Sequence, residues 1–148
     1  MTLRSRHLLI VATVLTALGT QATSARDSNS LMDISSDGRL LACSNRDSGT
    51  VTIIDLNTLK KLHETPVGVH PEGVAFLGKT HSLAVAVYND DQVTLLDADS
   101  GKVLYRVEVF DEPYGIVSNA DGSRDYVTLE YPGRVVEISR AGKVLRQF

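Results

Sequence analysis

Short apolar runs separated by polar turn residues recur along the chain from residue 31 onward. In the middle of the chain this pattern predicts four strands, Gly73–Phe76, Leu83–Tyr88, Gln92–Asp97 and Lys102–Val109. The segments between them are rich in Asn, Asp and Gly, which is typical of β-hairpins. No helical period competes after the first 25 residues. The fold class predicted is therefore all-β.

The pattern occurs three times at a fixed spacing. Val51, Val93 and Val135 hold equivalent positions, since 93−51 and 135−93 both give 42. A period in the forties with several short strands per copy is typical of β-propeller blades. We therefore expect about three four-stranded antiparallel blades that form an incomplete ring. The same step relates three further pairs: Asp55 and Asp97, Pro71 and Pro113, Gly73 and Gly115.

The third strand of each copy is apolar on both sides. In the first copy Val51 and Ile53 point one way, while Thr52 and Ile54 point the other. A strand buried on one face only would alternate apolar with polar residues, so this pattern predicts blades sandwiched between neighbours. The third copy departs, because Glu137 takes the position of Ile53. Either that face is more exposed, or the carboxylate has a partner.

The first 25 residues read as a signal peptide. Arg4 and Arg6 precede an apolar run from residue 8 to residue 18, and small residues follow, with cleavage expected after Ala22 or Ala25. A run this short does not span a bilayer, which needs about 20 residues. The protein is therefore expected to be periplasmic or secreted. The domains predicted are the signal peptide (1–25), a linker (26–30) and blades over 31–71, 72–113 and 114–148, with residue 148 expected inside or just after the last strand of the third blade.

Charge and cysteine content exclude some classes of function. Without residues 1–25 the chain has 15−2 = 13 basic and 18 acidic residues, a net charge of −5. The basic residues are scattered, which argues against nucleic-acid binding. Cys43 is the one cysteine, so no internal disulfide, zinc or haem-attachment motif can form from it. Its apolar surroundings predict a buried, unreactive thiol.

The repeat resembles the YVTN-type β-propeller repeat. The segments 51–58 (VTIIDLNT) and 66–75 (PVGVHPEGVA) match its pattern of a V-x-V-I-D-x-x-T strand and turn leading into V-G-x-x-P-x-G-V-A. The third copy has Tyr126-Val127-Thr128, with Leu129 where asparagine is usual. The second copy departs at Val109-Phe110, where the family has Val-Gly. The resemblance covers residues 31–148.

This resemblance implies an exported, non-enzymatic propeller that acts as a binding or interaction scaffold. Related propellers carry haem or sit beside cytochrome domains, so the alternative is an accessory propeller portion of a larger redox or cytochrome-containing protein. No haem-ligating motif here supports carrying the cofactor over, and no cofactor is predicted. The motif residues have structural explanations: Asp55 and Asp97 accept turn N–H groups, and the prolines stiffen the connections between blades.

Candidate chemistry is sparse. His63, His70 and His81 lie at unrelated places in the repeat, and their spacing does not predict a shared metal site. The acidic pairs Asp90-Asp91 and Asp111-Glu112 fall at turns and lack the alternating oxygen ligands of a calcium loop. No nucleophile motif or phosphate-binding glycine loop is present. We therefore predict no catalytic residue and no metal site.

A binding surface is expected on the face that carries the inter-blade loops, because loops on a rigid scaffold carry recognition. The candidates are His70 and Glu72 in the first inter-blade loop, and Glu112 and Tyr114 in the next. Propellers have about four to eight blades, and three blades leave two apolar faces uncovered. Two explanations remain open: the chain is a fragment of a longer protein, or a homodimer completes the ring. No protein or small ligand can be named.

Overall fold

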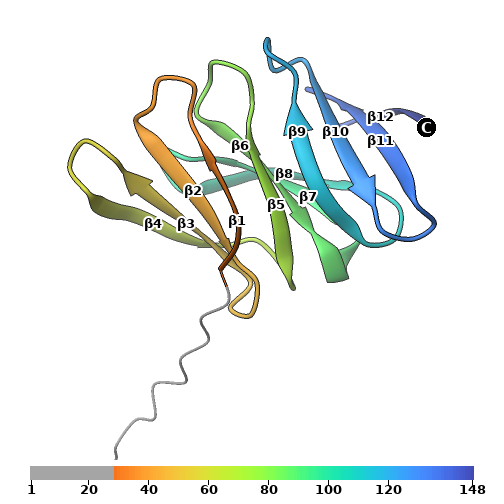
Figure 1. The fold of residues 1–148 in the computed structure, drawn as a ribbon, viewed down its shortest axis with the longest axis horizontal. Coiled ribbons are helices and arrows are strands. Elements are labelled where there is room, and N and C mark those ends of the chain that lie inside the picture. Colours follow the sequence, from red (N-terminus) through yellow and green to blue (C-terminus); the bar gives the residue numbers. More distant parts are fainter. Residues whose placement is uncertain (1–28) are drawn as a thin grey trace, which may run out of the picture.

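The computed structural model describes residues 29–148, and the predicted signal peptide lies outside the described residues. Twelve strands form three four-stranded antiparallel sheets, each with its strands in chain order. We refer to these sheets as blades 1, 2 and 3. The prediction of propeller-type blades is confirmed, and over these residues the three blades do not close into a ring (Figure 1).

The strand bounds follow the predicted pattern closely. Blade 1 holds β1 (Asn29–Ile34), β2 (Leu40–Asn45), β3 (Thr50–Asp55) and β4 (Lys60–Pro66). Blade 2 holds β5 (Pro71–Phe76), β6 (Ser82–Val87), β7 (Gln92–Asp97) and β8 (Lys102–Glu108), with a 3₁₀ turn, η1 (Tyr88–Asp90), between β6 and β7. Blade 3 holds β9 (Pro113–Ser118), β10 (Arg124–Leu129), β11 (Arg134–Ser139) and β12 (Val144–Gln147).

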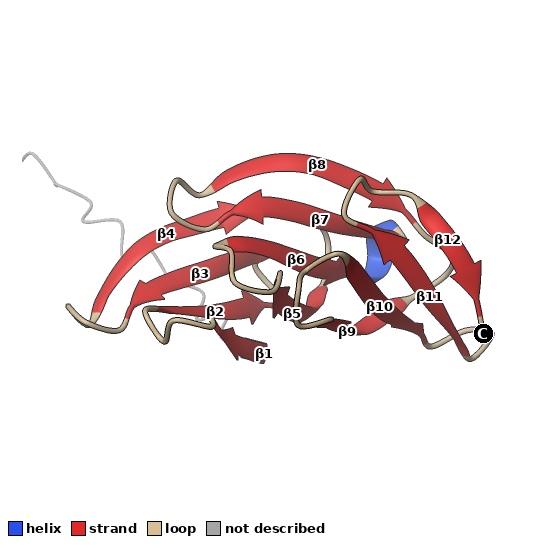
Figure 2. Ribbon diagram, turned by 90° about the horizontal axis from the view of Figure 1, so that it is seen from above, coloured by secondary structure: helices blue, strands red, loops and turns tan. Residues whose placement is uncertain are grey.

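The blades stand side by side and fan outward. The innermost strands β1, β5 and β9 are neighbours, and the outermost strands β4, β8 and β12 lie along the outer arc (Figures 1 and 2). Pro71 and Pro113 are the first residues of β5 and β9, so each blade begins at the innermost strand directly after an inter-blade loop. This arrangement repeats the same loops at each blade junction.

Two apolar cores lie between the blades. Val51 and Ile53 of β3 are fully buried against blade 2, in a core that includes Val85 and Leu96. The second core joins blades 2 and 3 and includes Leu95 and Val127. In blade 2 both faces of β7 are therefore buried, as predicted for a sandwiched blade. Cys43 is also buried, and this burial raises the pKa of its thiol.

The repeated aspartates stabilise turns. Asp55 Oδ1 accepts hydrogen bonds from the backbone N–H groups of Asn57 and Thr58, at 3.0 and 2.9 Å. Asp97 Oδ1 accepts one from the N–H of Ser100 at 2.7 Å. The Ser100 hydroxyl also donates to Asp97 at 2.6 Å. This hydroxyl bond and the Ser100 N–H lower the pKa of Asp97, and the N–H bonds from the turn lower that of Asp55. The predicted turn role is confirmed.

The outward faces of blades 1 and 3 differ in chemistry. On blade 1, Met32 and Ile34 of β1 are exposed. The equivalent residues of blade 2, Val74 and Phe76, are buried. On blade 3, Glu137 takes the position that Ile53 and Leu95 occupy in the two cores. Blade 1 therefore has the expected apolar face, whereas on blade 3 Glu137 interrupts a face that still carries Val117 and Val135.

Glu137 is only 3% exposed because two arginines cover it. Arg124 Nε lies 3.1 Å from one carboxylate oxygen, and Arg146 Nε lies 2.5 Å from the other. Both arginines come from the strands that flank β11 in the same sheet. Of the two explanations for Glu137, exposure or a partner, the structure supports the partner.

Candidate functional site

The inter-blade loops are held by hydrogen bonds that repeat with the blades. The backbone N–H of Tyr88 donates to the carbonyl of His70 at 2.9 Å, and the N–H of Glu130 donates to the carbonyl of Glu112 at 2.9 Å. Donors and acceptors both differ by 42 residues, since 130−88 and 112−70 both give 42. Each β4–β5-type loop therefore lies beside the β6–β7-type loop of the next blade. We call this end of the blades the loop-bearing face.

His70 and Glu112 have the same backbone conformation. Their φ angles are 54° and 57°, in the left-handed region that non-glycine residues seldom adopt. Each precedes the proline that begins an innermost strand. Because the strain recurs at equivalent positions, it belongs to the architecture of the inter-blade loop. The structure thus brings these two predicted site residues to matching places at successive junctions.

Glu72 and Tyr114 were expected in the loops, and this expectation is wrong. They are the second residues of β5 and β9 and continue the innermost strands. Glu72 is 3% exposed, whereas Tyr114 is exposed. The four predicted residues all lie along the loop-bearing face, but Glu72 is covered by its neighbours.

Arg46 covers Glu72. Arg46 follows β2 of blade 1, and its Nε lies 2.6 Å from Glu72 Oε1 in blade 2. The same arginine lies 3.8 Å from Asp47. Ser44 Oγ donates a hydrogen bond to the carbonyl of Glu72 at 2.6 Å, so blade 1 holds both the side chain and the backbone of this residue. At the loop-bearing face, the first junction is therefore held by the Arg46–Glu72 ion pair and by the Ser44 hydroxyl.

The second junction has aromatic residues at the corresponding positions. Tyr88 and Tyr114 meet edge to face, with ring centroids 6.4 Å apart and planes at 86°. Hydrogen bonds of the Tyr88 hydroxyl with Glu130, burial and a hydrogen bond with Glu112 together raise its pKa. Tyr88 therefore remains a neutral phenol, whose single O–H can donate to one of the two neighbouring carboxylates.

A small cavity lies at each junction on the loop-bearing face. The first has a volume of about 350 Å³ and the second about 360 Å³. The lining residues correspond at five positions 42 residues apart: Arg46 and Tyr88, Asp47 and Asn89, Gly49 and Asp91, Val69 and Asp111, His70 and Glu112. Tyr131 completes the second cavity. The fold thus makes the same cavity twice and lines it differently.

The two cavities differ in charge. The first contains Arg46 and Asp47, which lie close enough to offset each other. The second contains Asp91, Asp111 and Glu112 and no basic side chain among its lining residues. Two tyrosines form its walls, and one of them, Tyr131, is 68% exposed. Carboxylates together with aromatic rings suit a cationic group.

The opposite end of the blades carries a charged network. His81 Nδ1 lies 2.6 Å from Asp99 Oδ2, and His63 Nε2 lies 2.7 Å from the carbonyl of Asp99. The spacing of the histidines did not indicate this arrangement, which arises because adjacent blades place His63 and His81 beside the turn that carries Asp99. Among residues 29–148, no group of His, Cys, Asp and Glu side chains is arranged to hold a metal ion.

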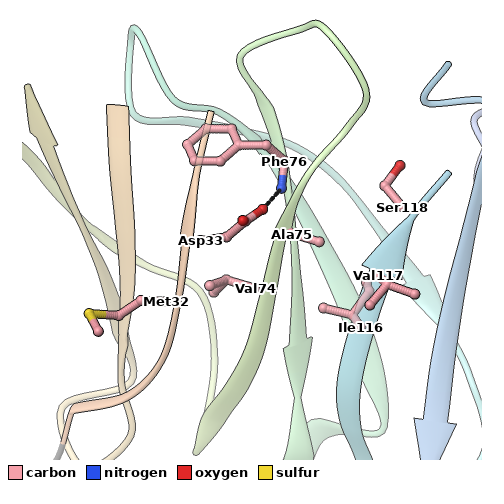
Figure 3. A pocket seen from close by; sticks show the side chains of 8 residues that line it. All are labelled: Met32, Asp33, Val74, Ala75, Phe76, Ile116, Val117 and Ser118. Carbon is pink, nitrogen blue, oxygen red and sulfur yellow. Dashed lines mark hydrogen bonds between the residues drawn. The ribbon is translucent and has the colours of Figure 1, made fainter. Parts of the chain in front are cut away.

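A groove follows the innermost strands. It is lined by two adjoining cavities of about 350 and 450 Å³ that share Met32, Val74, Ile116 and Val117. Asp33 is the one charged residue in its lining, and this carboxylate already accepts the N–H of Phe76 at 2.8 Å (Figure 3). This groove offers apolar surface without a free charged group, so the loop-bearing face is the better candidate site.

The fold defines a protein built from β-propeller-type blades. Compared with solved structures, the chain is similar to one titled hydrazine synthase from Kuenenia stuttgartiensis, with a TM-score of 0.79 and 26% identity. The match covers 88% of this chain and 38% of the length of that chain. No protein-family model matches, and no curated protein sequence matches. In the part of the chain that is described, no helix has the length and apolarity to cross a membrane.

Sequence reasoning missed the residues that complete the site. Arg46, Tyr88 and Tyr131 were not among the predicted binding residues, although Arg46 contacts Glu72, Tyr88 contacts Tyr114, and Tyr131 lines the same cavity as Glu112. A usable signal was present: 72−46 and 114−88 both give 26, so the repeat relates the two contacting pairs. Once one such pair is known, the other follows from the 42-residue step.

Proposed function

We propose that this protein is an exported, non-enzymatic binding scaffold of YVTN type, and that its loop-bearing face recognises a partner. The observation that supports this most directly is the pair of equivalent cavities with different linings. A purely structural repeat has no need to replace a balanced Arg46 and Asp47 with neutral Tyr88 and Asn89 beside three carboxylates. Variation of exposed side chains on a constant backbone is what recognition requires.

The second cavity is the part of this face that contacts a cationic group of the partner. An ammonium or guanidinium group, as on a lysine or arginine side chain, fits both its charge and its aromatic walls. The carbonyl of Glu112 accepts the N–H of Glu130 and its own N–H donates to Asp91, so its backbone is positioned before any ligand arrives. Such preorganisation lowers the entropy lost on binding.

The test is a nuclear magnetic resonance titration of the full chain with Nα-acetyl-lysine methylamide. Its Nε-acetylated form, which keeps the lysine side chain and removes its charge at the cost of an added acetyl group, is the control ligand. We expect millimolar binding of the charged form, with shifts centred on Tyr88 and Tyr131. Tyr131→Ala should weaken it roughly three- to thirtyfold, the range of a cation–π contact, and His70→Gln in the first cavity should leave it unchanged.

Two results would count against this function. Equal shifts with both ligands would show that charge is not recognised. Shifts spread over all acidic turns, abolished by modest salt, would show diffuse attraction to a chain with a net charge of −3 instead of a site.

A second candidate is favoured by the structural comparison. The chain covers 38% of the length of the similar solved chain, which is compatible with an accessory propeller portion of a larger redox or cytochrome-containing protein. Sequencing the gene beyond codon 148 tests this candidate. A continuing reading frame with a Cys-x-x-Cys-His motif supports it. Further blades without such a motif favour the scaffold, and a stop codon leaves the homodimer as the route to a closed ring.

A further inference from the structure

The network opposite the loop-bearing face crosses the junction between blades 1 and 2. His81 belongs to the turn after β5 in blade 2, and Asp99 belongs to the turn after β7 in the same blade. Asp37 belongs to the turn after β1 in blade 1. The imidazole of His81 lies between the two aspartates, with Nδ1 2.6 Å from Asp99 Oδ2 and Nε2 3.0 Å from Asp37 Oδ2. One ring thus links two blades.

This geometry depends on the protonation of the ring. A neutral imidazole has one N–H and can donate to one carboxylate only, whereas imidazolium donates from both nitrogens. A neutral ring would place a lone pair against one of the two carboxylate oxygens. Two carboxylates at hydrogen-bond distance from the two nitrogens therefore correspond to the charged form.

The surrounding charges favour that form. Arg39 of blade 1 lies 3.0 Å from Asp99 and 3.3 Å from Asp55, so it offsets part of the negative charge. Asp97 lies close enough for His81 to lower the pKa of its carboxyl. Lys79 lies in the same turn as His81, and the ring of His63 contacts the carbonyl of Asp99.

The second junction lacks this arrangement. The residues 42 positions after Asp37, His81 and Asp99 are Lys79, Ser123 and Ala141. At this end of the second junction, Tyr105 makes a contact between blades, since its hydroxyl donates to the carbonyl of Arg140 at 2.6 Å. His63 holds the position of Tyr105 at the first junction, and both side chains contact a turn of the next blade. Only the first junction adds a titratable bridge.

We infer that His81 is a proton-dependent clamp between blades 1 and 2. When the ring is charged, it joins Asp37 to Asp99 and holds the blades together at this end. When the ring loses its proton, one of the two contacts is lost and the junction loosens. Arg46 and Glu72 form an ion pair across the other end of the same junction, and Arg46 lines the first cavity. Loosening of the junction therefore also changes the shape of the first cavity.

The direction of the pH dependence follows from linkage. The hydrogen bond with Asp99, together with that with Asp37, raises the pKa of His81 above its usual 6.5. The stabilisation is therefore fully present below pH 6.5 and is lost as the pH rises through the higher pKa of the folded state. Each unit of difference between the two pKa values corresponds to roughly a tenfold change in the opening equilibrium.

The experiment is amide hydrogen exchange by mass spectrometry on the full chain between about pH 5.5 and 8.5, with rates corrected for intrinsic exchange. We expect protection of blade 1 relative to blade 3 to fall as the pH rises, by roughly tenfold for each unit of pKa shift. His81→Gln, which keeps one donor but does not titrate, should remove this dependence. His70→Gln, on the loop-bearing face, is the matched control and should keep it.

Two outcomes would overturn the clamp. One is a pH profile of blade 1 that is the same in wild type and His81→Gln, and the other is a pH effect spread equally over all three blades. If His81→Gln does not fold, ¹⁵N resonances of the wild-type ring decide the matter. Two protonated nitrogens at about pH 7, above the usual pKa of imidazole, support the clamp, and a neutral tautomer at that pH contradicts it.

Discussion

Arg46 Nε lies 2.6 Å from Glu72 Oε1 across the first junction, and the positions 42 residues later hold the edge-to-face pair Tyr88 and Tyr114. The backbone therefore offers one contact site at each junction, which either an ion pair or two aromatic rings can fill. Both solutions join an innermost strand to the preceding blade. They differ in what they leave at the surface, because the ion pair neutralises itself whereas the tyrosines lie among carboxylates.

This equivalence predicts that the two solutions can be exchanged as pairs but not singly. Arg46→Tyr alone removes the guanidinium from a buried carboxylate and should lower the melting temperature. Combining it with Glu72→Tyr installs the pair found at the second junction and should recover most of the loss. Thermal unfolding followed by circular dichroism measures both variants, with Arg46→Lys as the charge-conserving control. A double variant less stable than either single one would contradict the equivalence.

Much of the fold could be predicted because its determinants are local. Strand residues, turn aspartates and the 42-residue step all lie within short windows of sequence, and the β7 prediction, Gln92–Asp97, matched the structure at both ends. Tyr88 was expected to end a strand, but it begins η1 instead. The resemblance to the YVTN repeat indicated the same blade architecture, although the comparisons support only the propeller-type fold.

The site was harder to predict because it depends on how blades meet. Arg46 and Glu72 are 26 residues apart, a spacing that is not a multiple of the repeat, so their contact emerges only when two blades are placed side by side. The same holds for His81 and Asp37, which are 44 residues apart. Composition and period identify equivalent residues but do not identify contacting ones.

Asp125 is a polar residue at a position that is apolar in the other two copies of the repeat. It holds the position of Leu41 and Leu83, is 2% exposed, and its Oδ1 has no hydrogen-bond partner among the described residues. A buried polar atom without a partner destabilises a protein by about 1–3 kcal/mol. Asp125→Leu, which restores the repeat residue, should therefore stabilise the protein by about that amount, as measured by urea unfolding.

The pKa shift of Asp125 also predicts how the stability of the protein depends on pH. Burial raises the pKa of Asp125 above 3.8, so the folded state holds its proton more tightly than the unfolded state. Wild-type stability should fall as the pH rises from about 4 through this higher pKa. Asp125→Leu and Asp125→Asn should both lose that slope, while only the leucine variant gains packing. If stability falls with pH as steeply in Asp125→Asn as in wild type, the pH dependence arises from another carboxyl group.

The outward face of blade 3 gives a prediction about self-association. Glu137 and its two arginines make this face polar where blades 1 and 2 present Ile53 and Leu95. Glu137→Leu restores the apolar pattern and leaves two unpaired arginines at its edge. We expect stronger self-association than in wild type by light scattering, because the face then resembles those that pack between blades. Glu137→Gln, which is polar and of similar size, should remain as dispersed as wild type. Equal association of both variants would show that charge alone had kept the chains apart.

The innermost strands give a prediction about close backbone packing. A Cβ atom at Gly73 would lie 2.5 Å from the carbonyl oxygen of Tyr114 and 2.9 Å from the N atom of Ile116, so it meets backbone of the next blade. At the equivalent Gly115 it would meet the Thr128 side chain at 3.0 Å, which can rotate away. Gly73→Ala should therefore destabilise by about 2–3 kcal/mol, and Gly115→Ala by less than about 1 kcal/mol.

Urea unfolding of these two variants tests whether blades 2 and 3 are packed at the distance the structure gives. The comparison is well matched because both glycines sit at the same place in the repeat and neither has a φ that only glycine favours. The effect on the unfolded chain is then the same for both, so the difference reports the native contact. Equal losses would mean that β9 can move away from β5, and the tight contact between Gly73 and Tyr114 would then not hold the junction.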